Sequence, residues 1–66
     1  MQIIVNGEAV EAPDNLTAAE LIRHLGLENE RLAMEINRQI APRSRHDEIV
    51  IQPNDKVEIV RAIGGG

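Results

Sequence analysis

The sequence predicts a small α+β domain of two layers, in which one helix packs on one face of a mixed four- to five-stranded sheet. Three observations predict it. An Asn-Gly pair at Asn6 and Gly7 joins two alternating segments, a single capped amphipathic segment follows, and the later segments alternate with the period of strands. One helix of about nine residues cannot shield both faces of a sheet, so the other face should contact water.

The first two strands are expected over residues 1–6 and 8–12. They are joined by Asn6 and Gly7, the residue types that best accept the positive φ angles of a type I′ turn. One face of the first strand carries the apolar side chains of Met1, Ile3 and Val5. Because side chains alternate along a strand, we expect this face to lie under the helix.

The helix is expected to begin after Thr17 and to run to about Leu25. Thr17 is a good N-cap, and Glu20 three residues later completes a capping box. The apolar stripe consists of Leu21, Ile22 and Leu25. Gly26 follows as a natural left-handed residue at the C-terminal end of the helix.

Strand alternation resumes over residues 32–37, and a short strand follows over 39–41. Residues 43–48 are charged and expected to be irregular, while residues 49–51 fit either an edge strand or a helical turn. The last strand is expected over residues 56–62, parallel to the first strand and in the centre of the sheet. The residues that these two central strands place under the helix are Met1, Ile3, Val5, Val57 and Ile59.

The chain has 66 residues, which fits one domain over residues 1–63 followed by a flexible glycine tail over residues 64–66. A domain of this size buries only about 60% of the surface that its unfolded chain exposes. It therefore has little room for a deep catalytic pocket, which favours a carrier, an adaptor or a subunit over an enzyme.

Composition argues against several functions. The net charge is −4 and there is no aromatic residue, so the chain should be repelled by nucleic acid and offers no stacking platform for bases. The absence of cysteine excludes disulfides, thiolate metal sites and a cysteine nucleophile. No apolar run approaches the ~20 residues of a membrane helix, and no signal peptide is visible, so we expect a cytoplasmic protein without a membrane partner. A basic partner surface would suit its charge.

Several stretches carry a resemblance to a known family. They are Met1-Gln2-Ile3 with Asn6-Gly7, Thr17-Ala18-Ala19-Glu20-Leu21, Glu35-Ile36-Asn37 with Ala41-Pro42-Arg43, and Asn54-Asp55-Lys56-Val57-Glu58-Ile59-Val60 before the terminal glycines. Over its full length the chain resembles the ubiquitin-like, β-grasp proteins, and most specifically the ThiS family of sulfur carriers in thiamine (thiazole) biosynthesis. A third terminal glycine departs from the family pattern, but it leaves a Gly-Gly end.

The resemblance implies that the working group is the carboxylate of Gly66, with Gly64 and Gly65 as its tether. A ThiF-type adenylyltransferase would use ATP to adenylate Gly66. A persulfide from a cysteine desulfurase would then convert it to a thiocarboxylate, which would donate sulfur to the thiazole synthase ThiG. The carrier would be a co-substrate, with no catalytic residue, no metal and no bound cofactor of its own. Glycine suits the tail because it has no Cβ to clash in a narrow channel.

The carrier must also be recognised through its body. By alternation, Ile4, Val60 and Ala62 lie on the outer face of the sheet on adjacent strands, and Ile63 follows them. We expect these four residues to form an apolar patch that docks the partners. Isolated surface apolar residues are common, which is the alternative interpretation.

Other candidate groups are weaker. We expect His24 and His46 to be solvated, and Ser44 has no evident base other than the nearby His46. Arg43 and Arg45 fit a solvated loop or a partner contact.

Three other functions remain open at this point. The first is a MoaD-like carrier for molybdopterin synthesis, although MoaD chains tend to be longer. The second is a ubiquitin-like modifier that joins Gly66 to lysines of target proteins. The third is an interaction module with an inert tail.

Overall fold

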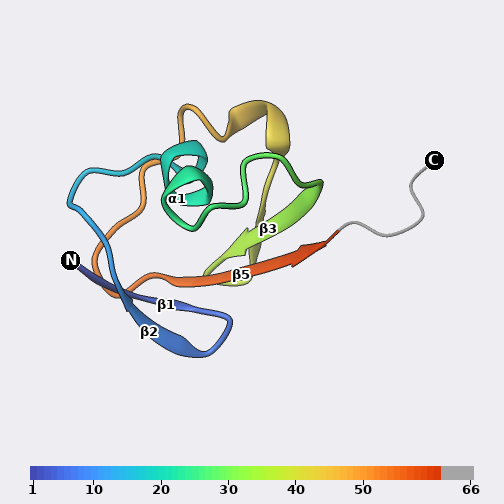
Figure 1. Ribbon diagram of the computed structural model, residues 1–66. Coiled ribbons are helices and arrows are strands. Elements are labelled where there is room, and N and C mark those ends of the chain that lie inside the picture. The colour runs from blue at the N-terminus through green and yellow to red at the C-terminus, as the bar shows by residue number, and fades with distance from the viewer. Residues whose placement is uncertain (62–66) are drawn as a thin grey trace.

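A five-stranded sheet forms one layer of the protein, and helix α1 lies across one face of it (Figure 1). The computed structural model describes residues 1–61. The strands are β1 (Gln2–Val5), β2 (Glu8–Glu11), β3 (Leu32–Ile36), β4 (Gln39–Ala41) and β5 (Lys56–Arg61). Helix α1 spans Ala18–His24, and a short 3₁₀ helix, η1, spans Arg43–Arg45. The predicted α+β architecture with one helix on one face is confirmed.

Strand β5 lies at the centre of the sheet, whose strand order is β2-β1-β5-β3-β4. It runs parallel to β1 and antiparallel to β3. Val57 and Ile59 are buried on the helix side, while Glu58 and Val60 are exposed on the other side. The predicted central, parallel position of the last strand is confirmed. Apolar residues alternate along β5 because only one of its faces is covered by the helix.

Two tight turns close the hairpins at the ends of the sheet. Asn6 and Gly7 have φ angles of 49° and 84°, which confirms the predicted left-handed turn between β1 and β2. Asn37 and Arg38, with φ angles of 51° and 69°, form the corresponding turn between β3 and β4. In both hairpins an asparagine therefore takes the first left-handed position, a conformation that asparagine accepts more readily than most residues.

The start of helix α1 is a complete capping box. The Thr17 N–H donates to Oε1 of Glu20 at 2.9 Å, and the Glu20 N–H donates to Oγ1 of Thr17 at 3.1 Å. The hydrogen bond from the Thr17 backbone lowers the pKa of Glu20 below its ordinary value of 4.5. The ionised carboxylate thus stabilises the folded chain above pH 4.5, and this contribution is lost as the pH falls through the lowered pKa. Gly26 follows the helix with φ 75°, as predicted.

Replacing the cap residue should weaken the helix measurably. Thr17→Ala is expected to lower the free energy of unfolding by about 1 kcal/mol at pH 7, because the Glu20 N–H loses its acceptor at the helix end. Urea denaturation followed by far-UV circular dichroism measures this difference. Ser44→Ala, which removes a hydroxyl from an exposed position in η1, is the matched control. Equal stability of the Thr17 variant and the parent chain would contradict the assignment of the cap.

The core lies between α1 and the inner face of the sheet. Its largest fully buried side chains are Ile3, Leu21, Met34, Ile51 and Val57. Met1, Val5 and the remaining stripe residues Ile22 and Leu25 pack against it while partly buried. The residues predicted under the helix therefore do belong to the core or its margin.

The segment between β4 and β5 differs from the prediction. Residues 49–51 form neither an edge strand nor a helical turn, but pair with the segment before α1 through an isolated antiparallel bridge between Val50 and Thr17. The Ala18 N–H donates to the Ile49 carbonyl, which ends the pairing where helix α1 begins. Residues 43–48, expected to be irregular, begin with the 3₁₀ turn of η1.

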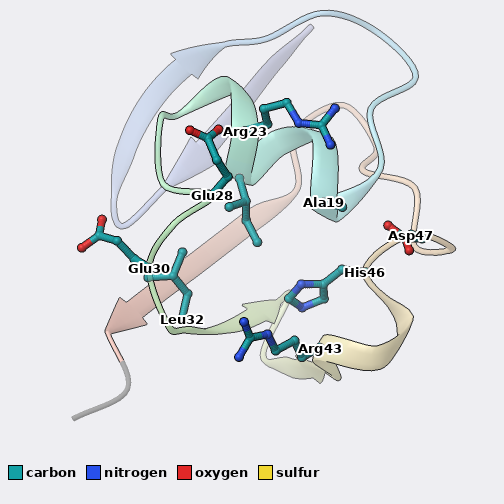
Figure 2. A pocket seen from close by; sticks show the side chains of 9 residues that line it. Ala19, Arg23, Glu28, Glu30, Leu32, Arg43, His46 and Asp47 are labelled. Carbon is teal, nitrogen blue, oxygen red and sulfur yellow. The ribbon is translucent and has the colours of Figure 1, made fainter.

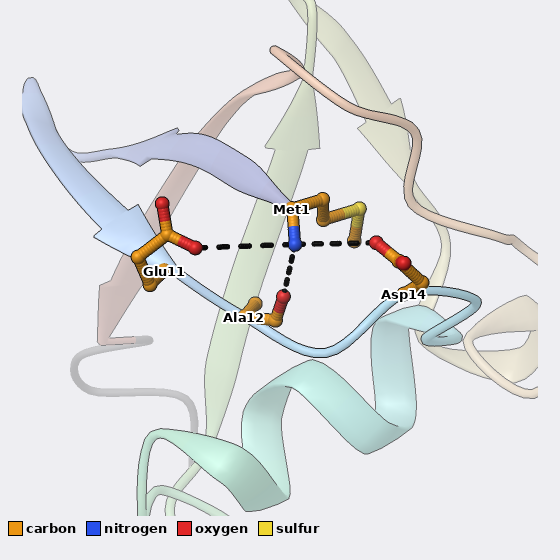
Figure 3. A network of polar contacts seen from close by, with 4 residues as sticks. All are labelled: Met1, Glu11, Ala12 and Asp14. Atoms are coloured by element: carbon orange, nitrogen blue, oxygen red, sulfur yellow. Dashed lines mark hydrogen bonds and ion pairs between the residues drawn. The ribbon is translucent and has the colours of Figure 1, made fainter.

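The N-terminal ammonium of Met1 is bonded to the segment that follows β2 (Figure 3). It donates to the Ala12 carbonyl at 2.6 Å and lies 3.2 Å from Oδ1 of Asp14 and 4.0 Å from Oε2 of Glu11. Both carboxylates are exposed, so the charge pairing contributes at most about 1 kcal/mol. The contacts hold the beginning of β1 against the end of β2.

Candidate functional site

The candidate site is the end of β5, because this strand leads directly to the glycines at the end of the sequence. Gly64, Gly65 and Gly66, predicted as tether and reactive group, lie outside the described residues, as do Ala62 and Ile63. Figure 1 shows β5 between β1 and β3. The end of β5 is therefore the part of the described domain that lies nearest to the glycines in the sequence.

The predicted apolar patch on the outer face stays a prediction, because two of its four residues, Ala62 and Ile63, lie outside the described residues. Ile4 and Val60 do lie on the outer face of adjacent strands, but Ile4 is in register with Lys56 and Val60 is in register with Ala33. Four residues of β5 separate these positions, or about 13 Å at 3.3 Å per residue. Ile4 is also half-buried, whereas Val60 is 60% exposed. The register offsets β1 towards the start of β5, so Ile4 and Val60 are not direct neighbours on the outer face.

The outer face that carries Val60 also carries an acidic pair and an exposed isoleucine, which the sequence alone did not indicate. Glu58 of β5 is directly opposite Glu35 of β3, and Glu35 is directly opposite Ile40 of β4. Ile40 is 78% exposed and lies across from Glu35, while Val60, 60% exposed, lies two residues beyond Glu58 on β5. Like charges directly opposite each other on neighbouring strands are destabilising. Alternation alone assigns each residue to this face, but only the register brings them together.

The last described residue of β5 is tied to the loop that precedes β3. Nη2 of Arg61 lies 2.8 Å from Oε1 of Glu30. Arg61 is largely exposed, so this ion pair contributes little to stability. It nevertheless links the end of β5 to the segment that precedes β3.

A shallow depression of about 240 Å³ lies between α1, the start of β3 and the segment that contains η1 (Figure 2). His46 lines it, contrary to the expectation of a solvated side chain: it is only 7% exposed, and its Nε2 lies 2.9 Å from the Ala41 carbonyl oxygen. The ring can be buried because its polar edge is hydrogen-bonded. The charged lining residues are of both signs: Arg23, Arg43, Glu28, Glu30 and Asp47. The volume is below the range of about 300–1,000 Å³ typical of small-molecule sites.

The remaining candidates are surface groups. His24 is exposed, as predicted, and so is Ser44. Arg43 and Arg45 are exposed as well, and Nε of Arg45 lies 3.2 Å from Oε2 of Glu48. Within residues 1–61, no three His, Asp or Glu side chains are grouped so that they could hold a metal ion. In the same range, no helix has the length and apolar content required to cross a membrane.

Comparison with known proteins identifies the family. The family model described as ThiS family matches residues 3–66. The sulfur carrier protein ThiS of Escherichia coli (strain K12) is 32% identical over 66 residues, which cover all of both chains. A thiazole synthase of Paramagnetospirillum magneticum is 35% identical over 66 residues, but this chain spans only 20% of its length.

The fold gives the same result. The crystal structure of the thiamine biosynthesis protein ThiS from Geobacter metallireducens superposes with a TM-score of 0.84 at 29% identity, covering all of both chains. The family match includes both the described domain and the terminal glycines. The chain therefore belongs to the ThiS family and has the ubiquitin-like β-grasp fold.

Proposed function

We propose that this chain is a sulfur carrier of thiamine biosynthesis, and that the Gly66 carboxylate is its reacting group. The observation that carries the proposal is that the ThiS family match extends over residues 3–66 and so includes the glycines that follow the central strand. The relative of equal length from Escherichia coli is named a sulfur carrier protein, which supports the same function. The carrier acts as a co-substrate in the cytoplasm, where its activating partner has access to ATP.

The carboxylate must be activated before it can accept sulfur, because it is ionised at neutral pH and is a poor electrophile. An oxygen of the Gly66 carboxylate attacks the α-phosphate of ATP, and pyrophosphate leaves. The terminal sulfur of a persulfide then attacks the carbonyl carbon, and AMP leaves. A second thiol cleaves the resulting S–S bond, which leaves a thiocarboxylate on Gly66 and joins the two thiol groups as a disulfide.

Partner proteins catalyse each of these steps. A ThiF-type adenylyltransferase binds the ATP, a cysteine desulfurase supplies the persulfide, and the carrier itself binds no cofactor. The thiazole synthase ThiG accepts the sulfur and returns the carboxylate. The whole of this chain matches one fifth of a protein named thiazole synthase. That protein thus contains a segment similar to this carrier, which supports a thiazole synthase as the sulfur acceptor.

Intact-mass spectrometry tests the proposal. After incubation with ATP, a ThiF-type enzyme and a persulfide donor, the chain is expected to exchange one oxygen for sulfur, with the change located in the C-terminal peptide. Omission of ATP is the control. A chain that never gains sulfur would contradict the carrier function, and adducts on lysines of other proteins would indicate a modifier. Rescue of a thiamine auxotroph, but not of a molybdopterin-deficient strain, would identify the pathway.

The exposed outer face near the end of β5, centred on Val60 and Ala33, is proposed as the docking surface for the activating enzyme. Val60→Asp is expected to lower kcat/KM for adenylation by about tenfold or more, since it places a charge in an apolar contact without disturbing the core. The measurement is pyrophosphate release at varied carrier concentration.

The matched control for this prediction is Ala9→Asp. It adds the same charge to the same face but on β2, two strands away from β5. The far-UV circular dichroism spectrum should remain that of the parent chain in both variants. An unchanged kcat/KM in the Val60 variant, or an equal loss in both, would contradict a docking surface at this position.

A further inference from the structure

The side chain of Asn6 occupies the place of a strand residue beside the end of β5. Strand β1 ends at Val5, which is in register with Val57. Strand β5 continues to Arg61, and β3 accompanies it on its other side over that distance. On the β1 side, the Ile59 N–H donates to Oδ1 of Asn6 at 2.8 Å, and Nδ2 of Asn6 donates to the Ile59 carbonyl at 3.1 Å. Both polar groups of the Ile59 backbone are thus satisfied by one side chain.

Asparagine meets two demands at this position. The backbone of Asn6 has φ 49°, which the turn requires and few residue types accept. Its side-chain amide offers both an N–H donor and a carbonyl acceptor, as a peptide group does. It can therefore extend the hydrogen bonding between β1 and β5 by one more residue. Aspartate would accept the φ angle but lacks the donor. Glycine would accept the φ angle and offers neither group.

A comparable asparagine lies at the opposite end of β5. Asn37, with φ 51°, begins the β3–β4 turn. Its Oδ1 accepts from the Lys56 N–H at 3.0 Å, and its Nδ2 donates to Oδ1 of Asp55 at 3.0 Å. Lys56 is the first residue of β5, about 17 Å from Arg61 at 3.3 Å per residue. The fold therefore contains a similar side-chain contact that is remote from the tail.

We propose that Asn6 is a positioning residue for the tail. It holds Ile59, two residues before the last described position, and thereby sets the direction in which the chain leaves the domain. The inference rests on the proposed function of Gly66. A reacting group must be held close to its productive geometry, and a misplacement of about 1 Å can reduce the rate by about a hundredfold. If β5 frays at its end, fewer docked carriers present the carboxylate correctly. The effect should therefore appear in kcat for adenylation more than in KM.

The experiment compares Asn6→Gly, Asn6→Asp and Asn37→Gly, at a temperature where far-UV circular dichroism shows all of them folded. Pyrophosphate release with ATP and a ThiF-type enzyme gives kcat and KM separately. Both Asn6 variants are expected to lose about tenfold in kcat, within the range that misplacement produces. Asn37→Gly, although destabilised through its own lost contacts, should retain kcat within about twofold.

A second measurement separates failure of the inference from failure of the function. NMR relaxation of the Val60 and Arg61 backbone amides should show increased motion in both Asn6 variants but not in Asn37→Gly. Wild-type kcat in Asn6→Gly, or an equal loss in Asn37→Gly, would overturn the positioning role. If the parent chain releases no pyrophosphate at all, the proposed function fails, and unchanged motion of Val60 and Arg61 would then refute the role of Asn6 as well.

Discussion

Removal of residues 64–66 is expected to abolish thiocarboxylate formation and to leave the stability of the domain unchanged. The truncated chain still ends in a carboxylate, but it lacks three residues that span about 10 Å when extended. Its carboxylate would therefore not reach the active site of the activating partner. The buried core is formed by residues between Ile3 and Ile59, so the free energy of unfolding should change by less than about 0.5 kcal/mol. Intact mass after incubation with ATP, a ThiF-type enzyme and a persulfide donor provides the measurement.

Deletion of Gly66 alone is the informative control for this prediction. It leaves a Gly-Gly end and shortens the tail by only about 3.5 Å, so a reduced but measurable reaction is expected. Gly66→Ala keeps the length of the tail but adds a side chain at the reacting residue, and should also react poorly. Sulfur gain by the chain that lacks residues 64–66 would show that the glycine tail is not required for the reaction.

Leu21→Ala is expected to lower the free energy of unfolding by about 3 kcal/mol, since the substitution leaves a cavity between α1 and the sheet. Leu21 is fully buried, with 0% exposure, in the only α-helix of the described residues. A domain of 66 residues has a total stability of about 3–10 kcal/mol at 0.05–0.15 kcal/mol per residue. The substitution should therefore remove about a third or more of the total stability.

Denaturation of the Leu21 variant must be followed by far-UV circular dichroism, because the chain has no aromatic residue to report by fluorescence. Ile40→Ala removes a side chain that is 78% exposed and should change the stability by less than about 0.5 kcal/mol. Equal effects of the two substitutions would contradict the assignment of Leu21 to the core.

Features that depend on neighbouring residues were predicted correctly. The left-handed turn at Asn6 and Gly7, the capping box of Thr17 and Glu20, and the positive φ of Gly26 all follow from local conformational preferences. The alternation of β5 likewise indicated which of its faces is buried. Because a helix of seven residues covers only one side of the sheet, these elements together were sufficient for the fold class.

Features that depend on distant residues were missed or misplaced. The offset between Ile4 and Val60 on the outer face could not be predicted, because a parallel pairing has no connecting turn to define its register. The burial of His46 depends on a hydrogen bond to Ala41, which sequence pattern cannot reveal. The contacts of Asn6 with Ile59 join positions 53 residues apart, so at the sequence level Asn6 was only a turn residue.

The sequence by itself determined the elements, the covered face of each strand and the glycine end, since propensity, period and composition are properties of the chain alone. The tertiary structure decided which side chains are neighbours on the outer face and what holds β5 in place before the tail. Those contacts arise only when separate segments meet in one register, and their geometry is set by packing rather than by any local preference.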